Sequence, residues 1–181
     1  MPDVTRIPYD QAAKELLRGA LEHAGEFEVS HEVAAEPRVV DGWFEPAANV
    51  ALEGLLGRMT AQPCAFEPFS EAPGVADTLK CLGKLIGIWA ARERRSAGGR
   101  EPVPPMWLVC AGRPTSALAE LAVLPVEGWD DGVYRMVAKA LPLHVVVVPE
   151  LPRTGDTLIL RLMGRGRTLR EALDDLRQLP N

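Results

Sequence analysis

The chain has few of the residue patterns that identify large classes of protein. Only three of its 181 residues are cysteine, and no two of them form a CxxC pair, so neither a zinc cluster nor a redox motif is expected. Cys64, Cys81 and Cys110 each stand among apolar residues, which favours buried thiols in a reducing, cytoplasmic compartment. The glycine-rich loops GxGxxG and GxxxxGKS/T are also absent, which argues against the common nucleotide-binding motifs.

Long hydrophobic runs and an excess of positive charge are lacking as well. The longest aliphatic run, residues 143–149, is far too short to cross a bilayer. The first residues have no apolar stretch typical of a secretory signal, and we expect no membrane partner. The net charge of −5 and the pI of about 5.3 argue against a protein that coats nucleic acid, although a local basic face is compatible with both.

The spacing of apolar residues predicts helices and strands in alternation. Helices are predicted over residues 9–24, 48–59, 73–89, 116–123, 154–163 and from 168 onward. Strands are predicted over residues 26–33, 38–45, 62–69, 106–111 and 143–148, and residues 129–140 are expected to be irregular or helical. We therefore predict a single α/β domain over residues 1–181. Its core, residues 9–150, is a mixed central sheet flanked by helices, and residues 151–181 form a C-terminal helical extension.

The longest predicted helix has one apolar face and one polar stripe. Its apolar residues recur at helical spacing and make one apolar face, while we expect the lysine stripe of the same helix to face Asp41 and Glu67. These residues are Val75, Leu79, Leu82, Ile86 and Trp89. Asp77, Lys80 and Lys84 lie on a separate stripe, where a solvated helix face with one ion pair is the simplest interpretation.

Two acidic residues stand inside or beside apolar strand-like runs. Asp41 lies between Val-Val and Gly-Trp-Phe, and Glu67 follows Pro-Cys-Ala-Phe. Two carboxylates on neighbouring strands are suited to hold a divalent metal. Purely structural roles for the two residues stay open, because Asp41-Gly42 flanked by apolar pairs is typical of a type I′ hairpin turn without a catalytic or binding role. Glu67, next to Pro68, also fits a solvated carboxylate at the edge of a strand.

The order of these motifs resembles the PD-(D/E)XK nuclease-like fold. Within that superfamily the chain is most similar to the Rpn-type family of recombination-promoting nucleases and their transposase-like relatives, which implies a bacterial protein. The likeness covers about residues 9–163. It depends on Tyr9-Asp10 at the start of the first helix, Arg38-Val-Val-Asp41, Phe66-Glu67, the long helix after them, and residues 151–164.

The resemblance implies a restriction-endonuclease-like core (α-β-β-β-α-β) and a Mg²⁺-dependent DNA endonuclease. By motif position Asp41 and Glu67 would hold the metal, with the backbone carbonyl of Pro68 as a third ligand. The next motif position, usually Lys, is Phe69 here, which can neither orient water nor bind phosphate. Lys80 and Lys84 on the following helix are the candidates to replace it. Glu15 or Glu22 of the first helix would complete such a site.

Two further interpretations accompany the nuclease. The missing lysine is also expected of a relative that has lost the reaction. In a different functional class, the chain would be a non-catalytic α/β interaction module, for example a homodimer formed through the exposed parts of the C-terminal helices or through a sheet edge. The arginines of residues 153–170 could contact phosphates, but the acidic residues interspersed with them favour a self-neutralising surface.

Overall fold

The computed structural model describes residues 39–47, 52–96 and 101–179. They belong to Arg38–Asn181, one of the two units into which the chain divides; the other is Met1–Pro37. The helix predicted over residues 9–24, with Glu15 and Glu22, and the strand predicted over residues 26–33 lie outside the described residues. The single domain therefore stays a prediction, and the following account concerns the larger unit.

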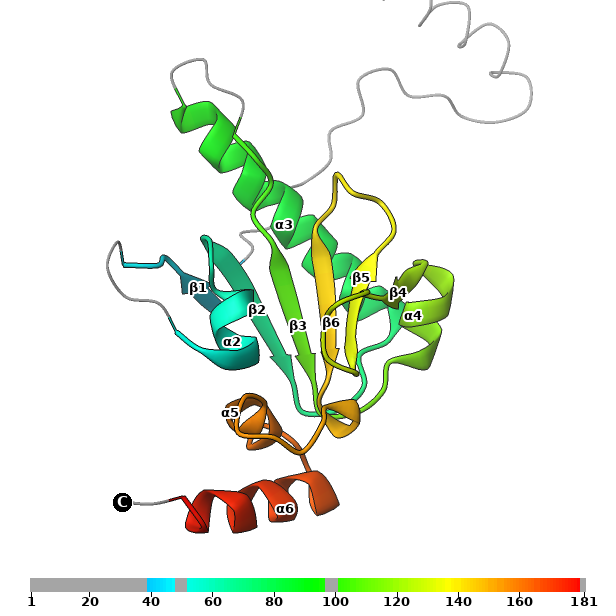
Figure 1. The fold of residues 1–181 in the computed structure, drawn as a ribbon. Coiled ribbons are helices and arrows are strands. Elements are labelled where there is room, and N and C mark those ends of the chain that lie inside the picture. Colours follow the sequence, from blue (N-terminus) through cyan, green and yellow to red (C-terminus); the bar gives the residue numbers. More distant parts are fainter. Residues whose placement is uncertain (1–38, 48–51, 97–100, 180–181) are drawn as a thin grey trace, which may run out of the picture. The chain divides into compact units, whose positions relative to one another are not determined.

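An open six-stranded mixed sheet forms the centre of this unit (Figure 1). Its strands in chain order are β1 (Gly42–Phe44), β2 (Cys64–Phe69), β3 (Met106–Cys110), β4 (Val123–Pro125), β5 (Val133–Met136) and β6 (Leu143–Val147). They lie side by side in the order β1-β2-β3-β6-β5-β4. The predicted α/β class with a mixed sheet is thus confirmed.

The middle of the sheet is parallel and its two edges are antiparallel. β2, β3 and β6 run parallel, with Glu67 opposite Leu108 and Leu108 opposite Val145. All five residues of β3 are buried, as expected for a strand covered on both faces. β1 pairs antiparallel with β2, and β5 pairs antiparallel with β6 and β4.

Helices cover both faces of the sheet. They are α2 (Gly54–Met59), α3 (Val75–Arg95), α4 (Thr115–Glu120), the 3₁₀ helix η1 (Val148–Glu150), α5 (Leu158–Arg161) and α6 (Gly166–Arg177). Cys81 and Leu85 of α3 pack with alternate residues of the strands, such as Leu108, in one apolar cluster. Leu55 and Met59 of α2 pack with the intervening strand residues in a second cluster. None of the described helices combines the length and apolar character that a membrane crossing requires.

The face of α3 that meets the sheet differs from the predicted one. Leu79 and Ile86 are exposed, by 51% and 47%. The buried positions are Thr78, Cys81, Leu82 and Leu85. At about 100° per residue, the centre of this buried face lies about 70° around the helix from the centre of the predicted stripe. The predicted apolar face is thus only partly the buried one, and the rotation places Lys84 beside Glu67.

Three other predicted elements need correction. Residues 133–136 form the strand β5, not the irregular or helical segment expected over residues 129–140, and β4 was not predicted at all. α5 spans only Leu158–Arg161 of the predicted 154–163. α6 begins at Gly166, whose φ is +55°, so Thr168 lies inside the helix and cannot be the N-cap residue of the predicted capping box.

His144 makes the fold sensitive to acid. The ring of His144 stacks on Trp107 with a centroid distance of 4.2 Å. Burial lowers its pKa to about 4, against the hydrogen bond with the Pro142 carbonyl. The unfolded chain takes up a proton near pH 6.5, before the folded chain does, so stability is complete above that pH and falls as the pH drops toward 4.

We expect His144→Phe to remove this pH dependence. Phenylalanine keeps the stack on Trp107 but does not titrate. Between pH 7 and pH 5, urea unfolding of the original chain should lose about 2 kcal/mol more than the variant does. An equal loss in both proteins would contradict a partly buried, neutral His144.

Candidate functional site

Glu67 is a charged residue in a place where the fold otherwise buries apolar side chains. It lies in β2, on the same strand face as Ala65, and its side chain is only 4% exposed. Alternation along β2 directs both residues toward the face that α3 covers. A carboxylate in such a position is costly unless it is paired and hydrogen bonded. The interpretation of Glu67 as a solvated edge carboxylate is therefore wrong.

Lys84 of α3 is the partner of Glu67. Its Nζ donates to Glu67 Oε1 at 2.9 Å and to Oε2 at 2.8 Å, and its side chain is 22% exposed. Burial lowers the pKa of Lys84, but the hydrogen bond and the negative charge of Glu67 outweigh it, so the pKa is raised above its ordinary value. Lys84 is therefore an ammonium group at neutral pH. Around the axis of α3, Lys84 lies about 110° from the centre of the buried face, which places it at the edge of the interface between the helix and the sheet.

Asp41 completes the group from the neighbouring strand. Its backbone N–H donates to Glu67 Oε1 at 3.3 Å. The β1–β2 register pairs Gly42 with Phe66, so Asp41 comes next, beside Glu67. Since the nearer carboxylate oxygen of an aspartate lies within about 4.5 Å of its own backbone nitrogen, the nearest oxygens of the two carboxylates are no more than about 8 Å apart. The negative charge of Asp41 also contributes to the raised pKa of Lys84.

The hairpin interpretation of Asp41-Gly42 is not supported. A type I′ turn requires positive φ at both central residues. Neither Asp41 nor Gly42 has a positive φ, and Gly42 is already paired in β1. Asp41 thus precedes a strand.

The structure separates the two lysines that the sequence could not distinguish. Lys80 is paired with Asp77 at 3.1 Å, and its side chain is 74% exposed. Phe69, at the position where the nuclease motif has Lys, is partly buried against the apolar cluster under α3. Asp41, Glu67 and Lys84 therefore form the candidate site, and Lys80 lies outside it.

The donor set suits one kind of metal ion and argues against another. Within residues 39–47, 52–96 and 101–179, no group of three or more His, Cys, Asp or Glu side chains is arranged to hold a metal. A zinc-type site with all its ligands from side chains is not present there. Mg²⁺, however, is usually held by one or two carboxylates together with water and phosphate oxygens. Asp41 and Glu67 can supply those two carboxylates.

Sequence reasoning missed a second group next to this site. Trp43 of β1 follows Asp41 by two residues, and 37% of the residue is exposed. Arg92 of α3 lies with its guanidinium carbon 5.8 Å from the centre of the indole. The strand period alone could have found Trp43, because residues 41 and 43 point to the same face of a strand.

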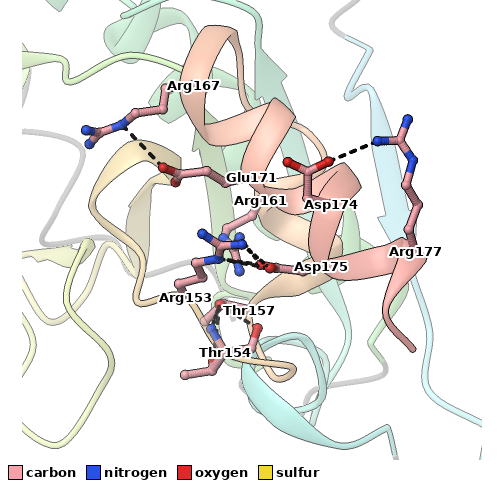
Figure 2. Close-up of polar contacts among 9 residues, drawn as sticks. All are labelled: Arg153, Thr154, Thr157, Arg161, Arg167, Glu171, Asp174, Asp175 and Arg177. Carbon is pink, nitrogen blue, oxygen red and sulfur yellow. Dashed lines mark hydrogen bonds and ion pairs between the residues drawn. The ribbon is translucent and has the colours of Figure 1, made fainter. Parts of the chain in front are cut away.

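The C-terminal arginines lie mostly among acidic partners (Figure 2). Asp175 of α6 accepts hydrogen bonds from both Arg153 and Arg161, and these two arginines hold its pKa down at about 2. Further ion pairs join arginines to acidic residues along α6 and to Glu71: they are Arg167–Glu171, Arg177–Asp174 and Arg165–Glu71. The self-neutralising surface expected for this segment is present, and a phosphate-binding stripe is not supported.

Breaking the Glu67–Lys84 pair should destabilise the fold. Lys84→Met leaves a buried, unpaired carboxylate, and we expect a loss of roughly 3 kcal/mol in the free energy of unfolding. The double variant Glu67→Gln/Lys84→Met should lose less than the sum of the two single changes. Urea unfolding of the four proteins measures this coupling. A loss below about 1 kcal/mol for Lys84→Met would show that the pair is not formed in solution.

No protein-family model, curated protein or solved structure matches this chain. The chemistry of the site is therefore inferred from Asp41, Glu67 and Lys84.

Proposed function

We propose that this chain is a Mg²⁺-dependent DNA endonuclease of the PD-(D/E)XK nuclease-like kind, in which the motif lysine has moved from the strand to α3. The observation that carries the proposal is the contact of both Glu67 carboxylate oxygens with Lys84, beside Asp41. Two carboxylates that could hold a metal and one cation that could contact a phosphate are groups that suit metal-assisted phosphodiester hydrolysis.

The connections around the site support the proposed restriction-endonuclease-like core. β1 and β2 are antiparallel neighbours, and α3 then connects β2 to the parallel strand β3. With α2 taken as an insert between β1 and β2, this is the β-β-α-β part of the expected α-β-β-β-α-β order. The helix and strand expected before it fall within residues 9–33, outside the described part of the chain.

In this proposal Asp41 and Glu67 hold the Mg²⁺. The bound ion would supply a water of lowered pKa and neutralise charge on the phosphate. Lys84 cannot act as a general base, because its raised pKa keeps the amine protonated at neutral pH. Its role is to donate hydrogen bonds to a phosphate oxygen or to the attacking water. In the reaction a water oxygen would bond to phosphorus and give up a proton to solvent, while the bond from phosphorus to one sugar oxygen breaks and that oxygen takes up a proton from solvent water to leave as a hydroxyl.

The expected activity is cleavage of plasmid DNA in Mg²⁺ or Mn²⁺. Asp41→Asn and Glu67→Gln should each reduce the rate by at least about 100-fold, since each removes a metal ligand. Lys84→Met should also lower it, whereas the matched variant Lys80→Met should cleave at the original rate. Equal rates for the Lys80 and Lys84 variants would contradict the role given to Lys84.

Metal binding can be measured apart from cleavage. Mn²⁺ at millimolar concentration should raise the melting temperature of the original chain and not that of Asp41→Asn. A shift without cleavage would assign the chain to relatives that hold the metal and have lost the reaction. Neither a shift nor cleavage would overturn the metal-dependent function.

A second candidate function is a non-catalytic interaction module, and the surface of α6 favours it. α6 buries only Ala172. Several apolar residues of α6 and of the segments beside it are exposed instead: they are Leu173, Leu176, Leu179, Ile159 and Met163. Clustered apolar side chains of this kind are common at protein–protein interfaces. The partner that we propose for this surface is a second copy of the chain.

The dimer predicts a specific response to substitution. Leu173→Ser/Leu176→Ser should convert a dimer of the original chain into a monomer, measured by size-exclusion chromatography with light scattering. The control Leu124→Ser changes an exposed leucine on β4 and should leave the mass unchanged. A monomeric original chain at about 100 µM would exclude this interface, since even a weak dimer of about 10 µM Kd is mostly associated there.

A further inference from the structure

Trp43 stands out among the exposed apolar residues of the described chain. It is the only aromatic side chain among them; the others are aliphatic or Met. It lies in β1 on the same strand face as Asp41, one alternation away. Its cross-strand neighbour is Ala65, whose methyl group is too small to cover an indole. The ring is therefore placed beside the candidate site with part of its surface open.

Arg92 lies next to this ring and is loosely held. Its guanidinium carbon is 5.8 Å from the indole centre. Its ion pairs with Glu45 and Glu101 are 3.7 and 3.5 Å long, its buried Nε has no hydrogen-bond partner, and its side chain is 32% exposed. Lys84 and Arg92 are two helical turns apart on α3, about 12 Å along its axis. The helix thus places one cation at the acid pair and another at the indole.

The charge of the chain restricts the kind of nucleic acid that can bind here. Duplex binding draws its affinity chiefly from neutralising phosphates with many cations, but the chain carries a net charge of −5, and most C-terminal arginines are paired internally. Stacking of a base on an aromatic ring does not depend on net charge. It needs an unpaired base, because the faces of bases in a duplex are already stacked on each other.

We infer that Trp43, with Arg92 beside it, is a stacking platform that selects single-stranded DNA at the Asp41–Glu67–Lys84 site. This inference rests on the proposed nuclease function and names its substrate class. An unpaired base stacks on the open part of the indole. Arg92 donates to the neighbouring phosphate, and the chain of nucleotides continues toward Asp41 and Glu67.

Binding without metal tests this inference separately from cleavage. The probes are a fluorescein-labelled oligo(dT) and a duplex of the same length, titrated with the full chain in EDTA and followed by anisotropy. We expect the single strand to bind at least about tenfold more tightly than the duplex. Trp43→Ala should weaken its binding by about 5- to 150-fold, whereas Trp43→Phe, which keeps an aromatic face, should retain most of it.

Tryptophan fluorescence reports on stacking directly. Oligo(dT) should quench the emission of the original chain, and Trp43→Phe should abolish the quenching. The matched variant Trp129→Phe changes a ring that packs against Trp107 and Arg58, and it should leave the quenching in place. Thermal melting of each variant verifies that it folds.

The outcomes separate the two proposals. Trp43-dependent binding of single strands without cleavage in metal upholds the platform and overturns the hydrolase. Metal-dependent cleavage with equal affinity for single strands and duplex, or with unchanged binding by Trp43→Ala, overturns the platform and leaves the hydrolase standing.

Arg92→Gln should lower the affinity for the single strand and also the dependence of that affinity on salt, because one phosphate contact is lost. An unchanged affinity in this variant would remove Arg92 from the platform.

Discussion

The pairing of Glu67 with Lys84 is the constraint that the rest of the site depends on. A carboxylate enclosed between a sheet and a helix needs a cation within hydrogen-bonding distance, and only one residue of α3 supplies it. If the apolar stripe predicted from the sequence faced the sheet, Lys84 would point directly away from Glu67. The observed rotation leaves Leu79 and Ile86 exposed. α3 therefore buries fewer apolar residues than it would if its apolar stripe faced the sheet, and it forms the Glu67–Lys84 ion pair instead.

The sequence predicts most of the fold because its strong patterns are local. The central strands and the long helix follow from apolar runs and helical spacing, and β2, β3 and β6 lie close to where these patterns place them. β4 and β5 were missed because they are short and because Gly128 and Gly132, both with positive φ, interrupt the pattern just before β5. Their pairing depends on the neighbouring strand β6, which a local pattern does not reveal.

The site was predictable only in part. The positions of Asp41 and Glu67 on adjacent strands could be inferred from motif order. The choice between Lys80 and Lys84 could not, because it depends on the angle at which α3 packs on the sheet. The contact of Trp43 with Arg92 depends on the same angle. A sound first assumption is that a helix buries its largest apolar stripe. The assumption fails where a charged group in the sheet needs an ion-pair partner from the helix.

The Glu67–Lys84 contact has a consequence for how the site takes up a cation. If the site holds Mg²⁺ as proposed, the ion would compete with an ammonium group that belongs to the same fold and contacts both carboxylate oxygens. The apparent affinity for the ion would therefore be weaker than two free carboxylates would give. Lys84, once displaced, would be free to contact an anion bound with the metal. In the absence of any ligand, Lys84 protects the fold from an isolated internal negative charge.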